Sequence, residues 1–313
     1  MSRVIDDELV EPVVRTLLGV IDVEGGPTDE QLAVLHALVH GLWERPDLDL
    51  DALEPLDPAG TAAAVTDVAQ RARVRELMVL LELCRHPLTQ TQVDRVATYA
   101  DAIDQSGPGL AMARTLVRDG AEEAMADYYR YLGDLGDKMT EPSMREQYPV
   151  SLEKPDHELA ARLRAMHDLP EHTLGWEYVE FYRRNGLKLP GDDPSMPALF
   201  VAHDMCHVIG GYEPTGQGEI ALGAMQLAIA DTPAHWMGFL GNLAVHEAGF
   251  LGTDDLQPKT ATLTRAGAPE MLAEGFRRGA ACTGDFTTAD HLAMAELPIA
   301  EVRAKFGVPP LSS

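Results

Sequence analysis

The chain lacks the residues that would mark a disulfide-rich or membrane-spanning protein. Its 313 residues include three cysteines and no Cys-x-x-Cys pair, so neither a disulfide framework nor a cysteine zinc site is predicted. No uninterrupted apolar run approaches the roughly 18 residues that a transmembrane helix needs. The first residues are charged and lack an apolar segment. We therefore expect no signal peptide and a cytoplasmic location.

Basic residues are also scarce. Lys and Arg total 25 against 50 Asp and Glu, which gives a formal net charge of −25 at pH 7. Such a charge repels phosphate backbones and anionic lipid headgroups, so we expect no nucleic-acid partner. Apolar residues make up 45% of the chain, enough for ordinary buried cores, which excludes a disordered acidic protein.

Apolar residues recur at helical spacing, and no convincing run of alternating strand residues is present. Thr28 with Gln31 and Thr89 with Gln92 form capping-box patterns that recur 61 residues apart. The recurrence indicates either an internal repeat or the chance reuse of a common helix cap. We predict an all-α protein with an N-terminal helical bundle.

Gly and Pro residues interrupt a polar stretch between residues 136 and 157, which predicts a domain boundary there. The predicted domains are the helical bundle over residues 1–140 and an all-helical metal-binding domain over residues 150–313.

The segment 21–31 resembles the acidic turn of TerB-like (tellurite-resistance-type) helical domains, in which an Asp-Gly-Glu-type turn precedes a capped helix and occurs twice. The resemblance covers about residues 5–105, although the second copy of the turn lacks the acidic residues. It implies that Asp22, Glu24 and Asp29 could bind a hard cation through their oxygen atoms. The alternative, which we favour, is a solvated turn with acids near a helix N-terminus.

Histidine is unevenly distributed, since eight of the eleven lie after residue 150. His203 and His207 are four positions apart in a predicted helix, so their imidazoles lie roughly 6 Å apart on one face and can converge on one ion. Glu219 begins the next predicted helix, and an antiparallel return would bring its carboxylate back to the pair. Asp204 is either a fourth ligand or a group that orients a ligand.

The predicted metal ligands, which are also the candidate catalytic residues, are therefore His203, Asp204, His207 and Glu219. Two imidazoles and a carboxylate suit Zn²⁺, with Fe²⁺ or Mn²⁺ as alternatives. Cys206 would point away from this face of the helix and pack in the core. The alternative to a metal site is a pair of buried histidines with a capping glutamate.

The pattern H-D-x-x-H-x11-E, complete from His203 to Glu219, is similar to the signature of the coenzyme Q (ubiquinone) biosynthesis protein 4 family. Three further segments resemble stretches of that family in the same order, at residues 169–181, 273–282 and 297–308. The resemblance implies an all-helical fold, a zinc-type site and a pocket for a prenylated quinone precursor. It also implies a role in ubiquinone biosynthesis, in organising the biosynthetic complex and in replacing the ring carboxyl at C1.

Two features depart from the family pattern. Met205 and Cys206 stand between the ligands, where the family usually has aromatic residues. The N-terminal helical region is also not part of the typical family pattern. The packing around the metal and the exact substrate are therefore expected to differ.

Four downstream residues are candidates for substrate binding. Arg277 and Arg278 could pair with a substrate carboxylate or diphosphate, or could complement a helix C-terminus. Trp236 and Phe239 could line a pocket for a prenyl chain, although apolar residues at helical spacing are more often core.

Three functions fit these patterns. The first is a metal-dependent enzyme that acts on a prenylated aromatic or quinone-like molecule, by ring decarboxylation or hydroxylation. The second is a non-catalytic lipid-binding scaffold with a structural metal. The third is a metallohydrolase, although Asp204 replaces the glutamate of H-E-x-x-H. We expect a hydrophobic or prenylated small-molecule partner, and leave open other biosynthetic enzymes, a homo-oligomer and a peripheral membrane location.

Overall fold

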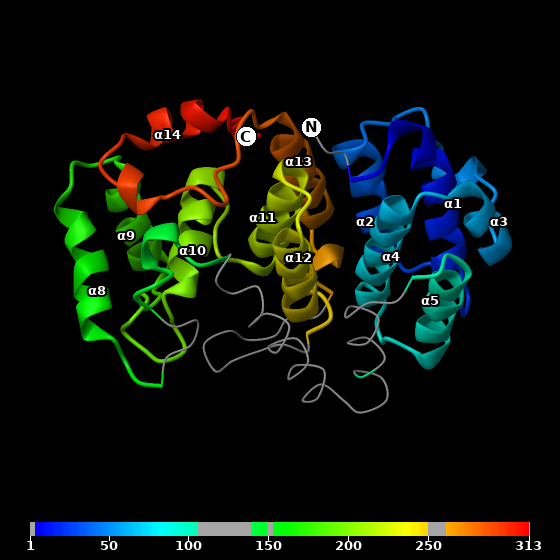
Figure 1. Ribbon diagram of the computed structural model, residues 1–313, viewed down its shortest axis with the longest axis horizontal. Coiled ribbons are helices and arrows are strands. Elements are labelled where there is room, and N and C mark those ends of the chain that lie inside the picture. The colour runs from blue at the N-terminus through cyan, green and yellow to red at the C-terminus, as the bar shows by residue number, and fades with distance from the viewer. Residues whose placement is uncertain (1–3, 106–114, 116–138, 149–152, 250–260, 313) are drawn as a thin grey trace.

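The computed structural model describes residues 4–105, 115, 139–148, 153–249 and 261–312. Within those ranges it contains helices and no β-strand, so the predicted all-α class is confirmed (Figure 1). Over the same ranges, no helix combines the length and the apolar character needed to cross a bilayer.

The N-terminal helices are α1 (Val10–Ile21), α2 (Asp29–Ala37), α3 (Pro58–Ala64), α4 (Val68–Leu83) and α5 (Gln90–Ala102). Two of them, α2 and α5, begin where the capping residues predict. The Thr28 hydroxyl accepts the N–H of Gln31, whose side chain accepts the N–H of Thr28, so the capping box is complete. Thr89 accepts the N–H of Gln92 in the same way at the start of α5.

The two capping glutamines make equivalent contacts across the bundle. Gln31 Nε2 donates to the Leu81 carbonyl near the end of α4, and Gln92 Nε2 donates to the Val20 carbonyl near the end of α1. Val20 and Leu81 are related by the same 61-residue offset as the glutamines, which also bond to each other at 3.1 Å. These equivalent contacts favour an internal repeat over the chance reuse of a helix cap. The resemblance to TerB-like domains stays a prediction.

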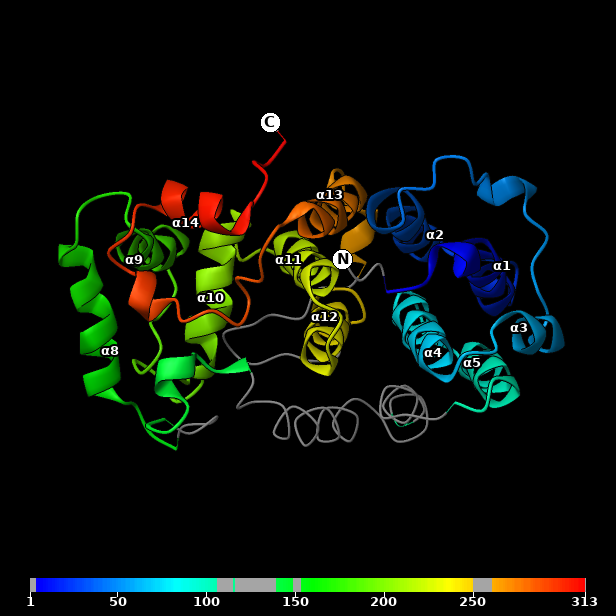
Figure 2. The ribbon, with the colours of Figure 1, turned by 45° about the horizontal axis from the view of Figure 1, so that its top comes forward.

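The later helices fall into two groups. They are α8 (His157–Arg164), α9 (Leu174–Asn185), α10 (Leu199–Gly210), α11 (Gly216–Ile229), α12 (Pro233–His246), α13 (Ala268–Ala281) and α14 (Ile299–Phe306). Figures 1 and 2 show α11, α12 and α13 between the N-terminal helices on one side and α8, α9, α10 and α14 on the other.

The buried side chains form two clusters, and the middle helices contribute to both. Phe239 and Phe276 belong to the cluster of α1–α5, whereas Leu222 of α11 belongs to the cluster of α8–α10 and α14. Gly41 allows the N-terminal bundle to approach α13 closely, because a Cβ at this position would lie 2.6 Å from the Ala273 carbonyl oxygen of α13. The middle helices thus share a core with the N-terminal bundle.

The boundary between residues 136 and 157 stays a prediction. Residues 136–138 and 149–152 of that region lie outside the described residues.

Candidate metal centre

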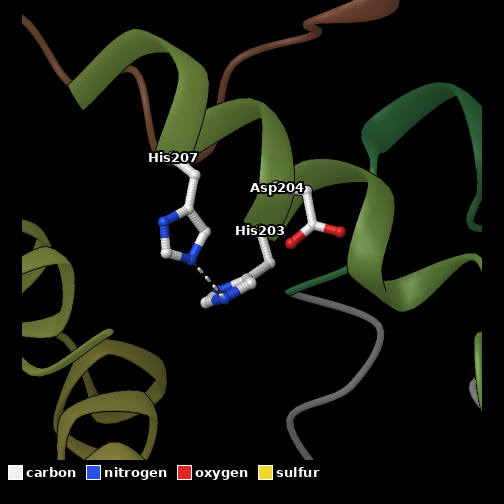
Figure 3. A group of neighbouring side chains, drawn as sticks. All are labelled: His203, Asp204 and His207. Carbon is white, nitrogen blue, oxygen red and sulfur yellow. Dashed lines mark hydrogen bonds between the residues drawn. The ribbon is translucent and has the colours of Figure 1, made fainter. Parts of the chain in front are cut away.

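Helix α10 carries three of the four predicted ligands. It ends at Gly210, and Gly211 follows in the left-handed conformation with φ 80°. Figure 3 shows the imidazoles of His203 and His207 converging from one face of this helix, with the Asp204 carboxylate beside them.

A tight turn then returns the chain to the histidines. Helix α11 begins at Gly216, three residues before the predicted start at Glu219, because the Thr215 hydroxyl accepts the N–H of Gly218 and caps the helix. Gly218 is sterically required, since a Cβ there would lie 2.1 Å from the Glu213 carbonyl oxygen. Glu219 therefore lies in the first turn of α11, where a carboxylate is favoured by the helix dipole.

The two imidazoles and both oxygens of the Glu219 carboxylate form a triangle of contacts between these two helices. His203 Nε2 lies 3.1 Å from His207 Nε2 and 3.2 Å from Glu219 Oε2. Glu219 Oε1 lies 3.1 Å from His207 Nε2. Around a tetrahedral zinc ion with bonds of about 2.0–2.1 Å, neighbouring ligand atoms are about 3.3–3.4 Å apart. The donor set and its spacing therefore fit a single ion.

His207 is oriented by a backbone carbonyl. Its Nδ1 lies 2.9 Å from the Tyr212 carbonyl oxygen, which can only accept, so Nδ1 carries the hydrogen. The Nε2 lone pair is then free to face His203 and Glu219, as in many metal-bound histidines. Phe181 of α9 stacks on the His207 ring at a centroid distance of 5.4 Å. The His207 side chain is fully buried, whereas that of His203 is 25% exposed and gives the site its access to the exterior.

The histidines and Glu219 share charge when no metal is bound. Burial lowers the pKa of His203, but the hydrogen bond and charge of Glu219 outweigh it and raise the pKa to about 9. Burial also opposes ionisation of Glu219, yet His207 and His203 hold the pKa of Glu219 well below its usual value. At neutral pH a metal ion must therefore displace a proton from this group.

Asp204 is held from the opposite side by α9. The Tyr182 hydroxyl donates a hydrogen bond to Asp204 Oδ2, and the Tyr178 hydroxyl lies 3.5 Å from that of Tyr182. Burial is the main cause that raises the pKa of Asp204. Sequence reasoning missed Tyr182, which follows Tyr178 in α9. Its place one helical turn later, on the same face, is the pattern that could have indicated it.

A buried ion pair supports the back of α10. Cys206 points away from the ligands, as predicted, with its Sγ 3.9 Å from His291 Nε2. His291 donates through Nδ1 to Glu141 Oε2 at 2.7 Å and through Nε2 to the Phe286 carbonyl at 2.8 Å. Because both ring nitrogens donate, His291 is an imidazolium. The side chains of His291 and Glu141 are fully buried, and sequence reasoning missed both.

Three of the four candidate substrate residues are buried within the fold. Trp236 and Phe239 are buried in the core shared with the N-terminal helices. Arg278 is buried and donates through Nε and Nη2 to the Pro309 carbonyl, while Arg277 is exposed. These contacts account for the burial of three of them, and substrate binding by all four stays a prediction.

The acidic turn of the N-terminal bundle has protein partners of its own. Glu24 Oε2 accepts a hydrogen bond from Thr89 and lies 3.7 Å from Arg85. Across the described ranges, Asp22, Glu24 and Asp29 do not form a group close enough to hold an ion, whereas the α10 residues His203, Asp204 and His207 do.

No protein-family model and no curated protein matches this chain. Among solved structures, a "putative ubiquinone biosynthesis protein" from Nostoc punctiforme matches with 20% sequence identity and a TM-score of 0.37, over 75% of this chain and 98% of that chain. At that TM-score the similarity establishes neither the fold nor the function of this chain.

Proposed function

We propose that this chain is a metal-dependent protein whose ion is held by His203, His207 and Glu219. The observation that carries the proposal is the triangle of Nε2, Nε2 and carboxylate atoms at 3.1–3.2 Å. The orientation of His207 by the Tyr212 carbonyl supports it. Zn²⁺ is the proposed ion, with Fe²⁺ or Mn²⁺ as alternatives, because all three accept this donor set.

The proposed substrate is a quinone-like or prenylated aromatic molecule, as in ubiquinone biosynthesis. This part rests on the complete H-D-x-x-H-x11-E pattern and the three further segments that resemble the coenzyme Q biosynthesis protein 4 family. Three protein ligands leave a coordination position open, and a metal bound there supplies Lewis acidity to a substrate oxygen such as that of a ring carboxylate. The exposure of His203, 25% for its side chain, supports entry of such a molecule on its side of the site.

Elemental analysis of the purified protein tests the metal site. Wild type is expected to retain about one ion per chain, and His207→Ala to lose it because two ligands remain. His172→Ala is the matched control, since His172 is an exposed histidine that pairs with Glu177. Equal metal content in wild type and His207→Ala would overturn the proposal.

Native mass spectrometry of the metal-loaded protein tests the substrate class. Prenylated benzoates are expected to bind more tightly than benzoate, since each buried methylene contributes about 0.8 kcal/mol. Equal binding of the two would reject a prenyl site and leave the metal site as a separate finding.

A further inference from the structure

We propose that Tyr182 is a positioning residue that keeps Asp204 out of the coordination sphere of the metal, so that one position stays open to an external ligand. The inference rests on the proposed function, because it presupposes an ion held by His203, His207 and Glu219.

Asp204 is close enough to become a ligand. One ligand atom from each of His203, Asp204 and His207 lies within 4.8 Å of the others, whereas the three proposed ligand side chains contact one another at 3.1–3.2 Å. Figure 3 shows the carboxylate next to the His203 ring. A side-chain rotation would bring the carboxylate to the ion and close the site with four protein ligands.

The Tyr182 hydroxyl opposes that rotation. It donates to Asp204 Oδ2 from α9, the helix on the side away from Glu219 and α11. Tyr182 is 1% exposed and Asp204 is 8% exposed, so water has little access to replace the bond. The Tyr178 ring packs edge-on against Tyr182 at 5.1 Å and holds the hydroxyl in place.

Loss of this hydroxyl would leave a buried carboxylate in need of a partner. A buried carboxylate without a hydrogen bond or counter-charge is costly, and the strongest positive charge within reach is the metal. The expected result is a four-ligand site that binds metal more tightly and excludes external ligands. If the Tyr182 hydroxyl only supported a metal ligand, its loss would change metal affinity in the opposite direction, since loss of such a hydrogen bond typically weakens metal affinity about 10–100-fold.

Cobalt-substituted protein and azide as an external ligand test the inference. Azide is expected to shift the visible Co²⁺ bands of wild type and to bind Tyr182→Phe at least about tenfold more weakly, while Co²⁺ leaves that variant more slowly when a chelator is added. Tyr99→Phe is the matched control, since it removes a buried tyrosine hydroxyl that bonds to the Leu56 carbonyl in the N-terminal bundle and should keep the wild-type response.

Two variants test whether Asp204 is the group that blocks azide in Tyr182→Phe. Tyr182→Phe/Asp204→Ala is expected to regain the azide response, and Asp204→Ala alone to keep it, because Asp204 is not a ligand in wild type. An undiminished azide response in Tyr182→Phe, or its loss in Asp204→Ala, would overturn this inference and leave the metal site standing. Failure of wild type to take up Co²⁺ would overturn both.

Discussion

Replacement of His291 by leucine removes one half of a buried ion pair behind the metal helix. His291 and Glu141 have fully buried side chains, and Glu141 also accepts the N–H of Leu292 at 3.1 Å. In His291→Leu the Glu141 carboxylate keeps that single donor and loses its counter-charge. Breaking such a pair from one side typically costs about 3–5 kcal/mol.

The pKa of His291 gives a second estimate of the stability that His291→Leu would lose. Burial lowers this pKa, but the contacts with Cys206 and Glu141 outweigh burial and raise it from 6.5 to about 10. At 1.36 kcal/mol per unit, that shift corresponds to about 5 kcal/mol of interaction in the folded state. Both estimates predict a loss that is a large fraction of the roughly 5–15 kcal/mol by which an ordinary domain is stable.

The pH dependence follows from the direction of the shift. Because the folded-state pKa is raised, the contribution is complete below pH 6.5, the unfolded value, and is lost as the pH rises towards 10. The matched reference is Glu141→Leu/His291→Leu, which removes both charges and should recover most of the stability. Wild type should lose stability relative to this double variant as the pH rises through that window.

Urea unfolding followed by far-ultraviolet circular dichroism measures these differences. A loss in His291→Leu below about 1 kcal/mol would refute the reasoning, since a one-sided break of a buried pair cannot be that small. A double variant as unstable as the single one would also refute it.

Two further predictions concern the site itself. Gly218→Ala should lower both the melting temperature and the metal content, because the added Cβ would lie 2.1 Å from the Glu213 carbonyl oxygen and displace Glu219. Gly238→Ala is the control, since its Cβ would lie 3.9 Å from the nearest atom, and it should lower neither quantity in thermal melting and elemental analysis. Zn²⁺ binding at pH 7 should release about one proton, since the pKa of His203 is about 9 before metal binds. Calorimetry in buffers of different ionisation enthalpy measures this proton release, and a release of zero would contradict the prediction.

The sequence predicted the local parts of this structure well. Thr28 and Thr89 start helices because a capping hydroxyl acts on an N–H only three residues further along the chain. The convergence of His203 and His207 also depends only on helical spacing. Such features can be predicted because the interacting groups lie within a turn of each other.

Features set by packing between distant segments were not predicted. The Tyr182 contact to Asp204 depends on how α9 packs against α10, and the Glu141–His291 pair joins residues 150 positions apart. The shared core of α11–α13 with the N-terminal helices depends on backbones that meet at Gly41. Hydrophobic spacing shows which face of a helix is buried and does not show which helix covers it.

The central claim is tested most directly by anomalous diffraction from crystals of the metal-loaded protein. The account predicts an anomalous peak about 2.0–2.1 Å from His203 Nε2, His207 Nε2 and the Glu219 carboxylate if the ion is zinc. A peak confined to other residues, or no peak between α10 and α11 in protein shown to contain metal, would contradict it.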